Sequence, residues 1–252
     1  MTRHSFCNHA EKDSLWYQRR GFLRAAAAWM AAGGFAGAHA QQRSNIVELV
    51  GDAQLNGARL LPQQTIQTGD QIATGPDTSL IFVVGNSSFK MRQNSRLSVE
   101  RGASLNTVSL LRLLGGAVAS VWGKGPQRQI VTPTLTAGIR GTGVYAEVFT
   151  NEDRRSYFCN CYGTVHLACG PDFVTSRSSY HQSFWGESQA KEGRYLRPAG
   201  TVNHGDEDLE YLARLVDQRT AWQILGHKGV RDGKGYMEDK PGQMHPALAI
   251  GK

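Results

Sequence analysis

The sequence lacks the short motifs that identify the commonest enzyme classes. It contains no nucleophile elbow, no HExxH zinc motif and no Walker phosphate loop. Catalytic acids and bases can converge from distant positions, but no residue pattern in this chain points to such a site. We therefore expect a protein that is not an enzyme and that has no catalytic residues.

Long apolar runs and basic clusters are also scarce. No segment reaches the ~20 consecutive apolar residues that span a bilayer. The net charge is +7, but no cluster or stripe of Lys and Arg accompanies it. Proteins that bind nucleic acid usually carry such a basic patch. The sequence therefore argues against a nucleic-acid partner and against a lasting membrane span.

The first 40 residues have the order of an export signal rather than of a folded domain. Arg19 and Arg20 precede a short apolar run rich in Ala and Gly, and Ala38 and Ala40 form a small-residue cleavage site. Twin arginines in this place are typical of bacterial twin-arginine export. We expect residues 1–40 to be a cleaved signal peptide and the protein to be periplasmic, with a short membrane anchor as the alternative.

The chain after residue 40 has the pattern of an all-β protein. Short apolar or alternating segments are separated by turn residues about every 8 to 12 positions, which is typical of a sandwich or a short solenoid. Asn56-Gly57 is a strong hairpin signal within the first of these segments. No repeat of fixed period is visible, so the sequence leaves sandwich and solenoid both open.

The period changes near the C-terminus, where residues 206–219 place apolar side chains on one helical face. Acidic residues begin this segment and basic residues follow, as the helix dipole favours. We expect a β domain over 42–170, a C-terminal extension over 171–225 with one helix, and a flexible tail over 226–252.

A glycine-rich stretch interrupts the strand pattern between residues 130 and 148. Its spacing resembles a phosphate loop, but no helix pattern follows it, so we reject that interpretation. We expect a structural turn in which the glycines adopt special backbone angles and Arg140 bonds to loop carbonyls, although Arg140 could instead contact a partner or ligand. The residues assigned to this turn are Pro133, Gly138, Arg140, Gly141 and Thr142.

The same stretch, VTPTLTAGIRGTGVYAEV, resembles the signature of the FecR domain, an all-β periplasmic module. Other segments resemble this family in its order: GDQIATG at 69–75, SLIF at 79–82, LLGGAV at 113–118 and YGTV at 162–165. The resemblance implies a FecR-like β-sandwich or short β-solenoid over about residues 46–168. In the family, it also implies signal relay from an outer-membrane receptor to a cytoplasmic sigma factor.

This chain departs from that family arrangement, because we expect neither a cytoplasmic N-terminal domain nor a lasting membrane helix. We therefore carry over the module but not the sigma-factor role. The expected function is binding or regulation through contact with a periplasmic or envelope protein.

The cysteines are not explained by the resemblance. Cys159 and Cys161 would lie on one face of a strand, with Cα atoms ~6.6 Å apart, and Cys169 could pair with one of them in a disulfide. They could instead bind a transition metal or haem together with His181 or His204, act as buried apolar residues, or take part in redox chemistry. The cofactor therefore stays unknown. We expect Cys159 and Cys161 to share one environment with at least one of these histidines.

Overall fold

The computed structural model describes residues 44–235. The expected signal peptide, with Arg19, Arg20, Ala38 and Ala40, lies outside the described residues, as does 236–252 of the expected tail.

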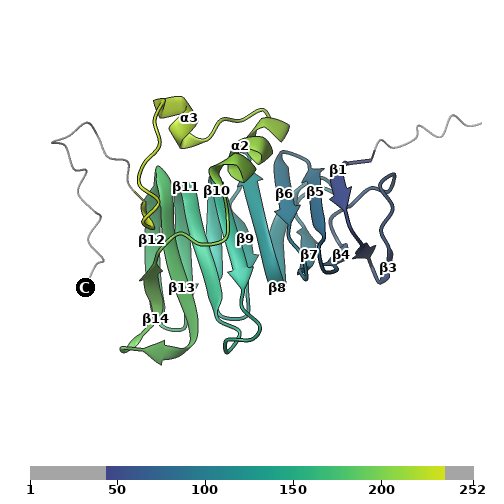
Figure 1. Ribbon diagram of the computed structural model, residues 1–252. Helices are drawn as coiled ribbons and strands as arrows, with labels where there is room; N and C mark the ends of the chain where they lie inside the picture. The colour runs from purple at the N-terminus through teal and green to yellow at the C-terminus, as the bar shows by residue number, and fades with distance from the viewer. Residues whose placement is uncertain (1–43, 236–252) are drawn as a thin grey trace, which may run out of the picture. The chain divides into compact units, whose positions relative to one another are not determined.

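The described chain consists mainly of strands, followed by two short helices near its end (Figure 1). The first seven strands are β1 (Ile46–Val50), β2 (Ala53–Leu55), β3 (Ala58–Arg59), β4 (Gln71–Thr74), β5 (Ser79–Val84), β6 (Ser87–Met91) and β7 (Arg96–Arg101). The next seven are β8 (Val108–Trp122), β9 (Arg128–Val131), β10 (Thr136–Val148), β11 (Ser156–Cys169), β12 (Asp172–Ser178), β13 (Tyr180–Lys191) and β14 (Arg194–Ala199). The remaining elements are α2 (Asp206–Leu215), α3 (Ala221–Leu225) and β15 (Lys234–Gly235).

Hydrogen bonds join these strands into one mixed sheet that is not closed into a barrel. Neighbouring strands are antiparallel, apart from the parallel pair β8–β9. The predicted all-β class is therefore confirmed. None of the helices between residues 44 and 235 has the length and apolar character needed to cross a membrane.

Three long strands, β8, β10 and β11, change neighbours halfway along their length. The first half of β8 pairs with β7 and β9, whereas its second half pairs with β6 and β10. Glycines with positive φ mark the change in each strand: Gly116 (71°), Gly141 (64°) and Gly163 (104°). Because each long strand belongs to two halves of the sheet, the sheet folds back on itself at these glycines.

The two halves share one inner core. Alternate residues of β5, such as Leu80 and Phe82, face this core together with Leu97 of β7 and Leu113 of β8. Phe82 stacks on Phe89 with ring centroids 5.1 Å apart. The halves thus face each other as the layers of a sandwich do, but they are continuous through the long strands.

The opposite face of one half is buried as well. On β8, β10 and β11, the residues that alternate with those of the inner core form a second cluster. This cluster includes Leu209 and Leu212 of α2 and Trp222 of α3. Lys90 Nζ lies 2.6 Å from Asp208 Oδ1, and the Ser88 hydroxyl donates to the Leu212 carbonyl at 2.7 Å, so β6 holds α2 in place. Figure 1 shows both helices on the same side of the sheet. The C-terminal region therefore acts as a cover for this face.

The C-terminal region differs from the expectation in four ways. Helix α2 ends at Leu215 rather than at residue 219, and α3 adds a second helix that begins with a Thr220 capping box. Five residues are too few to give a helical period, which is why the sequence pattern missed α3. The main sheet continues past the expected boundary at residue 170 with β12, β13 and β14, and β15 lies within the expected tail.

The expected turn is a bend inside β10. Pro133 lies in the tight connection before β10, where Thr132 N–H donates to the Leu135 carbonyl at 2.8 Å. A Cβ on Gly138 would lie 2.6 Å from Gln127 Nε2, and Thr142 is fully buried at the bend. Arg140 is exposed and pairs with Thr164 in the β10–β11 ladder, and its guanidinium makes no side-chain hydrogen bond within residues 44–235.

We predict that Gly141→Val lowers the free energy of unfolding by about 1–3 kcal/mol, because a β-branched residue is strained at φ +64°. Space is not the cause, since a Cβ there has its nearest neighbour at 4.0 Å. Chemical denaturation measures the change. Gly141→Asn is the matched control, because Asn tolerates this conformation; equal loss in both variants would contradict the explanation.

Candidate metal centre

Cys159 and Cys161 lie two residues apart on β11 and point to the outer face of the sheet. Their sulfur atoms are 3.7 Å apart, and both residues have no exposed surface. The period of a strand places their side chains on one face, as the sequence predicted. The cover formed by α2 and α3 excludes water from this position.

Two histidines complete the group, as one of them was expected to do. His181 Nδ1 lies 3.5 Å from Cys159 Sγ, His204 Nε2 lies 3.6 Å from Cys161 Sγ, and the two nitrogens are 3.0 Å apart. All four donor atoms lie within 4.8 Å of one another, and all four residues are buried. We call these four residues the Cys2His2 cluster.

Irregular backbone geometry directs the side chains of both histidines toward the cluster. His181, on β13, has φ +47°, and the pairing of β13 with β15 changes register between Tyr180 and Gln182. Such a bulge redirects the side chain that it carries. His204 follows Asn203, which has φ +56°, in the connection between β14 and α2. These backbone angles leave no clear signal in the sequence.

Hydrogen bonds determine which nitrogen of each histidine carries the hydrogen and which one presents a lone pair to the cluster. His181 Nε2 donates to Asp206 Oδ1 at 3.0 Å, and His204 Nδ1 donates to the Val202 carbonyl at 2.6 Å. Both acceptors lack a proton, so each outer nitrogen carries the hydrogen. With both rings neutral, the inner nitrogens would point lone pairs at each other over 3.0 Å. A cation, either a proton or a metal ion, is needed between them.

Four of the six distances between the donor atoms are close to those of a tetrahedral metal site. Bond lengths of ~2.3 Å to sulfur and ~2.05 Å to nitrogen give edges of ~3.8 Å for S···S, ~3.6 Å for S···N and ~3.3 Å for N···N. The corresponding distances are 3.7 Å for S···S, 3.5 and 3.6 Å for two of the S···N pairs, and 3.0 Å for N···N. The other two S···N distances are no longer than 4.8 Å. A single proton could satisfy only one nitrogen–nitrogen contact, whereas a metal ion accounts for all four donors.

Asp206 supports the cluster from outside. It is the first residue of α2, and it also accepts hydrogen bonds from Tyr180 Oη at 2.8 Å and Lys228 Nζ at 2.9 Å. Burial alone would raise the pKa of Asp206, but its bonds to His181, Lys228 and Tyr180 outweigh burial and lower the pKa well below its usual range. A carboxylate that orients a histidine ligand is common at metal sites. The sequence pattern identified Asp206 only as part of a helix start.

The cysteines differ in their electrostatics. Burial alone would raise the pKa of Cys159, but the hydrogen bond from Cys161 and the two histidines outweigh it and lower that pKa. Burial and the neighbouring Cys159 raise the pKa of Cys161. The two thiols thus shift in opposite directions, and a bound metal would favour the thiolate form of both.

Aromatic rings cover the histidines. The Tyr145 ring stacks on His204 with centroids 4.5 Å apart, and Trp222 stacks on His181 at 5.4 Å. Trp222 Nε1 donates to Glu210 Oε1 at 2.7 Å, which links α3 to α2 above the cluster. The rings fix the orientation of both imidazoles and keep the site dry.

Cys169 does not belong to this group. The bend at Gly163 carries the second half of β11 into the other half of the sheet, so Cys169 faces the inner core. Its Sγ lies 3.5 Å from the Glu187 carbonyl, and burial raises its pKa to about 11. Cys159, Cys161 and Cys169 are all free thiols, so the disulfide alternative is not what the structure forms.

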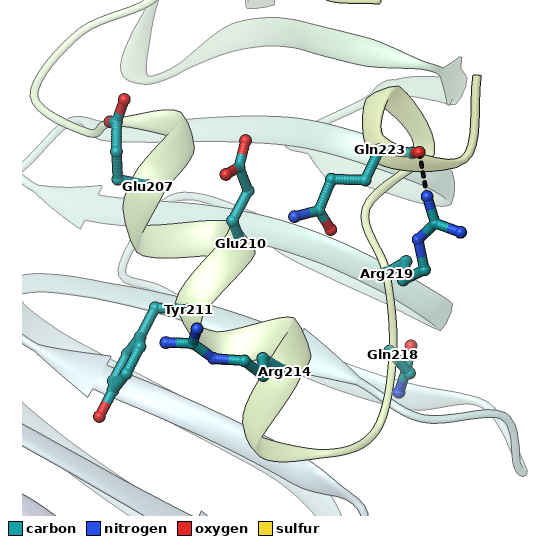
Figure 2. Close-up of a pocket in the computed structure, with 7 residues that line it drawn as sticks. All are labelled: Glu207, Glu210, Tyr211, Arg214, Gln218, Arg219 and Gln223. Carbon is teal, nitrogen blue, oxygen red and sulfur yellow. Dashed lines mark hydrogen bonds between the residues drawn. The ribbon is translucent and has the colours of Figure 1, made fainter. Parts of the chain in front are cut away.

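A separate surface cavity lies between α2, the connection that follows it and α3 (Figure 2). It has a volume of about 600 Å³ and is lined by Glu207, Glu210, Tyr211, Arg214, Gln218, Arg219 and Gln223. Arg219 donates to the Gln223 carbonyl across its rim. Its charges are mixed and none of the four cluster residues lines it, so it is distinct from the cluster.

Comparisons with known proteins yield a partial structural likeness. No model of a known family matches the sequence, and no curated protein matches it. Two structures of a candidate anti-sigma factor from Parabacteroides distasonis ATCC 8503 are similar over 57% and 53% of this chain, with TM-scores of 0.44 and identities of 7% and 6%. The matched region spans less than two thirds of that protein, 64% and 60%. A likeness of this size does not assign a function.

We predict that Cys159, Cys161 and Cys169 are all unoxidised in the purified protein, because Cys169 lies in a different core from the other two. Alkylation in denaturant with a chelator and no reductant, followed by peptide mass analysis, should find one label on each. A peptide in which Cys169 is joined to Cys159 or Cys161 would contradict this arrangement.

Proposed function

We propose that this protein is an exported all-β binding module that carries one metal ion of the zinc type in the Cys2His2 cluster. The observation that supports it is the convergence of four buried donors at distances that suit a tetrahedral ion. All four positions are taken by protein ligands, and a structural site of this kind has no open position for substrate. The role of the metal is therefore structural rather than catalytic.

The donor set argues against haem and against a Rieske iron–sulfur centre. Haem supplies four of the ligands of its iron, so four protein donors around one point leave no place for the porphyrin. A Rieske centre divides two Cys and two His between two irons. Here each sulfur lies within 3.6 Å of a histidine nitrogen, which suits a single ion.

The metal would join two parts of the molecule. Three ligands, Cys159, Cys161 and His181, come from the sheet, whereas His204 comes from the connection that leads into α2. Binding free energy at such a site contributes directly to folding. The metal would therefore hold the C-terminal cover, and α3 above all, against the outer face of the sheet.

The wider role rests on sequence motifs. The resemblance to the FecR domain supports a binding or regulatory module that contacts a periplasmic or envelope protein. A twin-arginine signal would export the chain already folded. Folding before export allows the metal to enter in the cytoplasm, before the thiols meet an oxidising compartment.

We expect the purified protein to contain close to one equivalent of zinc, because four protein donors define one site. Elemental analysis measures it, and substitution with Co²⁺ should give the intense visible absorption of a tetrahedral thiolate site. Cys159→Ser should lose the metal and melt at lower temperature. Cys169→Ala is the matched control, since it removes a buried thiol outside the cluster. Metal well below one equivalent in the parent protein, or equal metal in both variants, would refute the proposal.

We expect replacement of Arg19 and Arg20 by Lys to leave uncleaved precursor in the cytoplasm, because the arginine pair is what the export pathway recognises. Cell fractionation and precursor size provide the measurement. Replacement of Arg24 by Lys serves as the control. Normal periplasmic accumulation of the double variant would rule out twin-arginine export.

A further inference from the structure

Residues 226–235 follow α3 and pass over the outer side of the Cys2His2 cluster. We call this segment the strap. Gly226, in a left-handed conformation, ends α3 and begins the strap. At its other end, the Gly235 carbonyl accepts from Ser179 N–H at 3.2 Å and the Gly233 carbonyl accepts from Ser183 N–H at 2.9 Å. The strap is thus tied to the chain on both sides of His181.

One side chain of the strap, that of Arg231, is linked by hydrogen bonds to both histidines of the cluster. Arg231 Nη1 donates to Asp206 Oδ1, the carboxylate oxygen that also accepts from His181 Nε2. Arg231 Nη2 donates to the backbone carbonyl of His204. The planar guanidinium can span two acceptors in this way, which an ammonium group cannot do with the same geometry.

Arg231 also lies between the buried cluster and the solvent. Its side chain is 36% exposed, whereas that of Asp206 beneath it is only 7% exposed and His181 is fully buried. Lys228 binds Asp206 from the same strap, but it contacts the other carboxylate oxygen and no part of His204. Arg231 therefore bonds from the solvent side both to the carboxylate that holds the His181 ring and to the backbone of His204.

We propose that Arg231 is a positioning residue that keeps the metal centre closed, and that the metal ion enters and leaves when the strap is released. This inference rests on the proposed function. When Arg231 is in place, Asp206 holds the His181 ring and the His204 backbone is anchored, so all four donors stay around the ion. Without it, either histidine can rotate away and open one coordination position.

The test uses the zinc-loaded full chain and an excess of a chromophoric chelator, which reports the release rate. Arg231→Gln should still bind one equivalent of zinc but should release it at least ten times faster, since loss of a group that orients a metal ligand typically costs about 10- to 100-fold in affinity. Arg219→Gln is the matched control, because Arg219 is exposed and bonds only near α3. Its release rate should equal that of the parent.

Further variants separate positioning from a general loss of stability. Combining Arg231→Gln with Asp206→Asn should accelerate release by less than the product of the two single effects, because both act on His181. If Arg231→Gln does not fold, Arg231→Lys replaces it and should also release zinc faster, since Lys cannot bridge both acceptors. The Co²⁺ absorption of the loaded variant should shift, which a change of stability remote from the site would not produce.

The outcomes are distinguishable. A parent protein that binds no metal overturns the proposed function and this inference with it. A parent that binds zinc, with release rates for Arg231→Gln or Arg231→Lys equal to that of Arg219→Gln, overturns the role of Arg231 alone. Independent, fully multiplicative effects of the Asp206 and Arg231 changes would also contradict it.

Discussion

Burial of both faces of one half of the sheet is the constraint on which the rest of this structure depends. The inner face packs against the other half of the same sheet, so it needs no further partner. The outer face carries apolar residues of alternate parity and requires a cover. Two short helices and a strap provide that cover. Elements of this length gain little stability from their own hydrogen bonds and depend on packing and on specific attachments.

The Cys2His2 cluster lies in this outer core, where polar groups are costly. Thiols and imidazoles removed from water must be bonded or neutralised. The outer nitrogens of both histidines are satisfied by Asp206 and the Val202 carbonyl. The inner nitrogens and both sulfurs face one another with no such partner outside the cluster. A bound cation would resolve this arrangement, and it would also explain why a carboxylate with four donors around it lies directly behind His181.

A metal ion that joins the sheet to its C-terminal cover would be compatible with folding before export. The ligands come from β11, β13 and the connection before α2, so the site exists only after the sheet and its cover have assembled. A chain exported unfolded would expose the same cysteines to oxidation. A chain that folds first can enclose both thiols and the ion, and Arg231 would then limit the exchange of that ion.

The sequence by itself determined the β class, most strand positions, the period that puts Cys159 and Cys161 on one face, and the helix beginning at Asp206. These are properties of local spacing and turn chemistry, which neighbouring residues carry. Only the tertiary structure decided that Cys169 lies in another core, that both histidines join the cysteines, and that Asp206 and Arg231 support them. Those outcomes depend on the bend at Gly163, on the irregular backbone at His181 and Asn203, and on contacts between residues far apart in the chain, such as Cys161 and His204, which are 43 positions apart. Residues far apart in sequence leave no periodic signal, because their proximity arises from how the sheet folds over and how its cover closes.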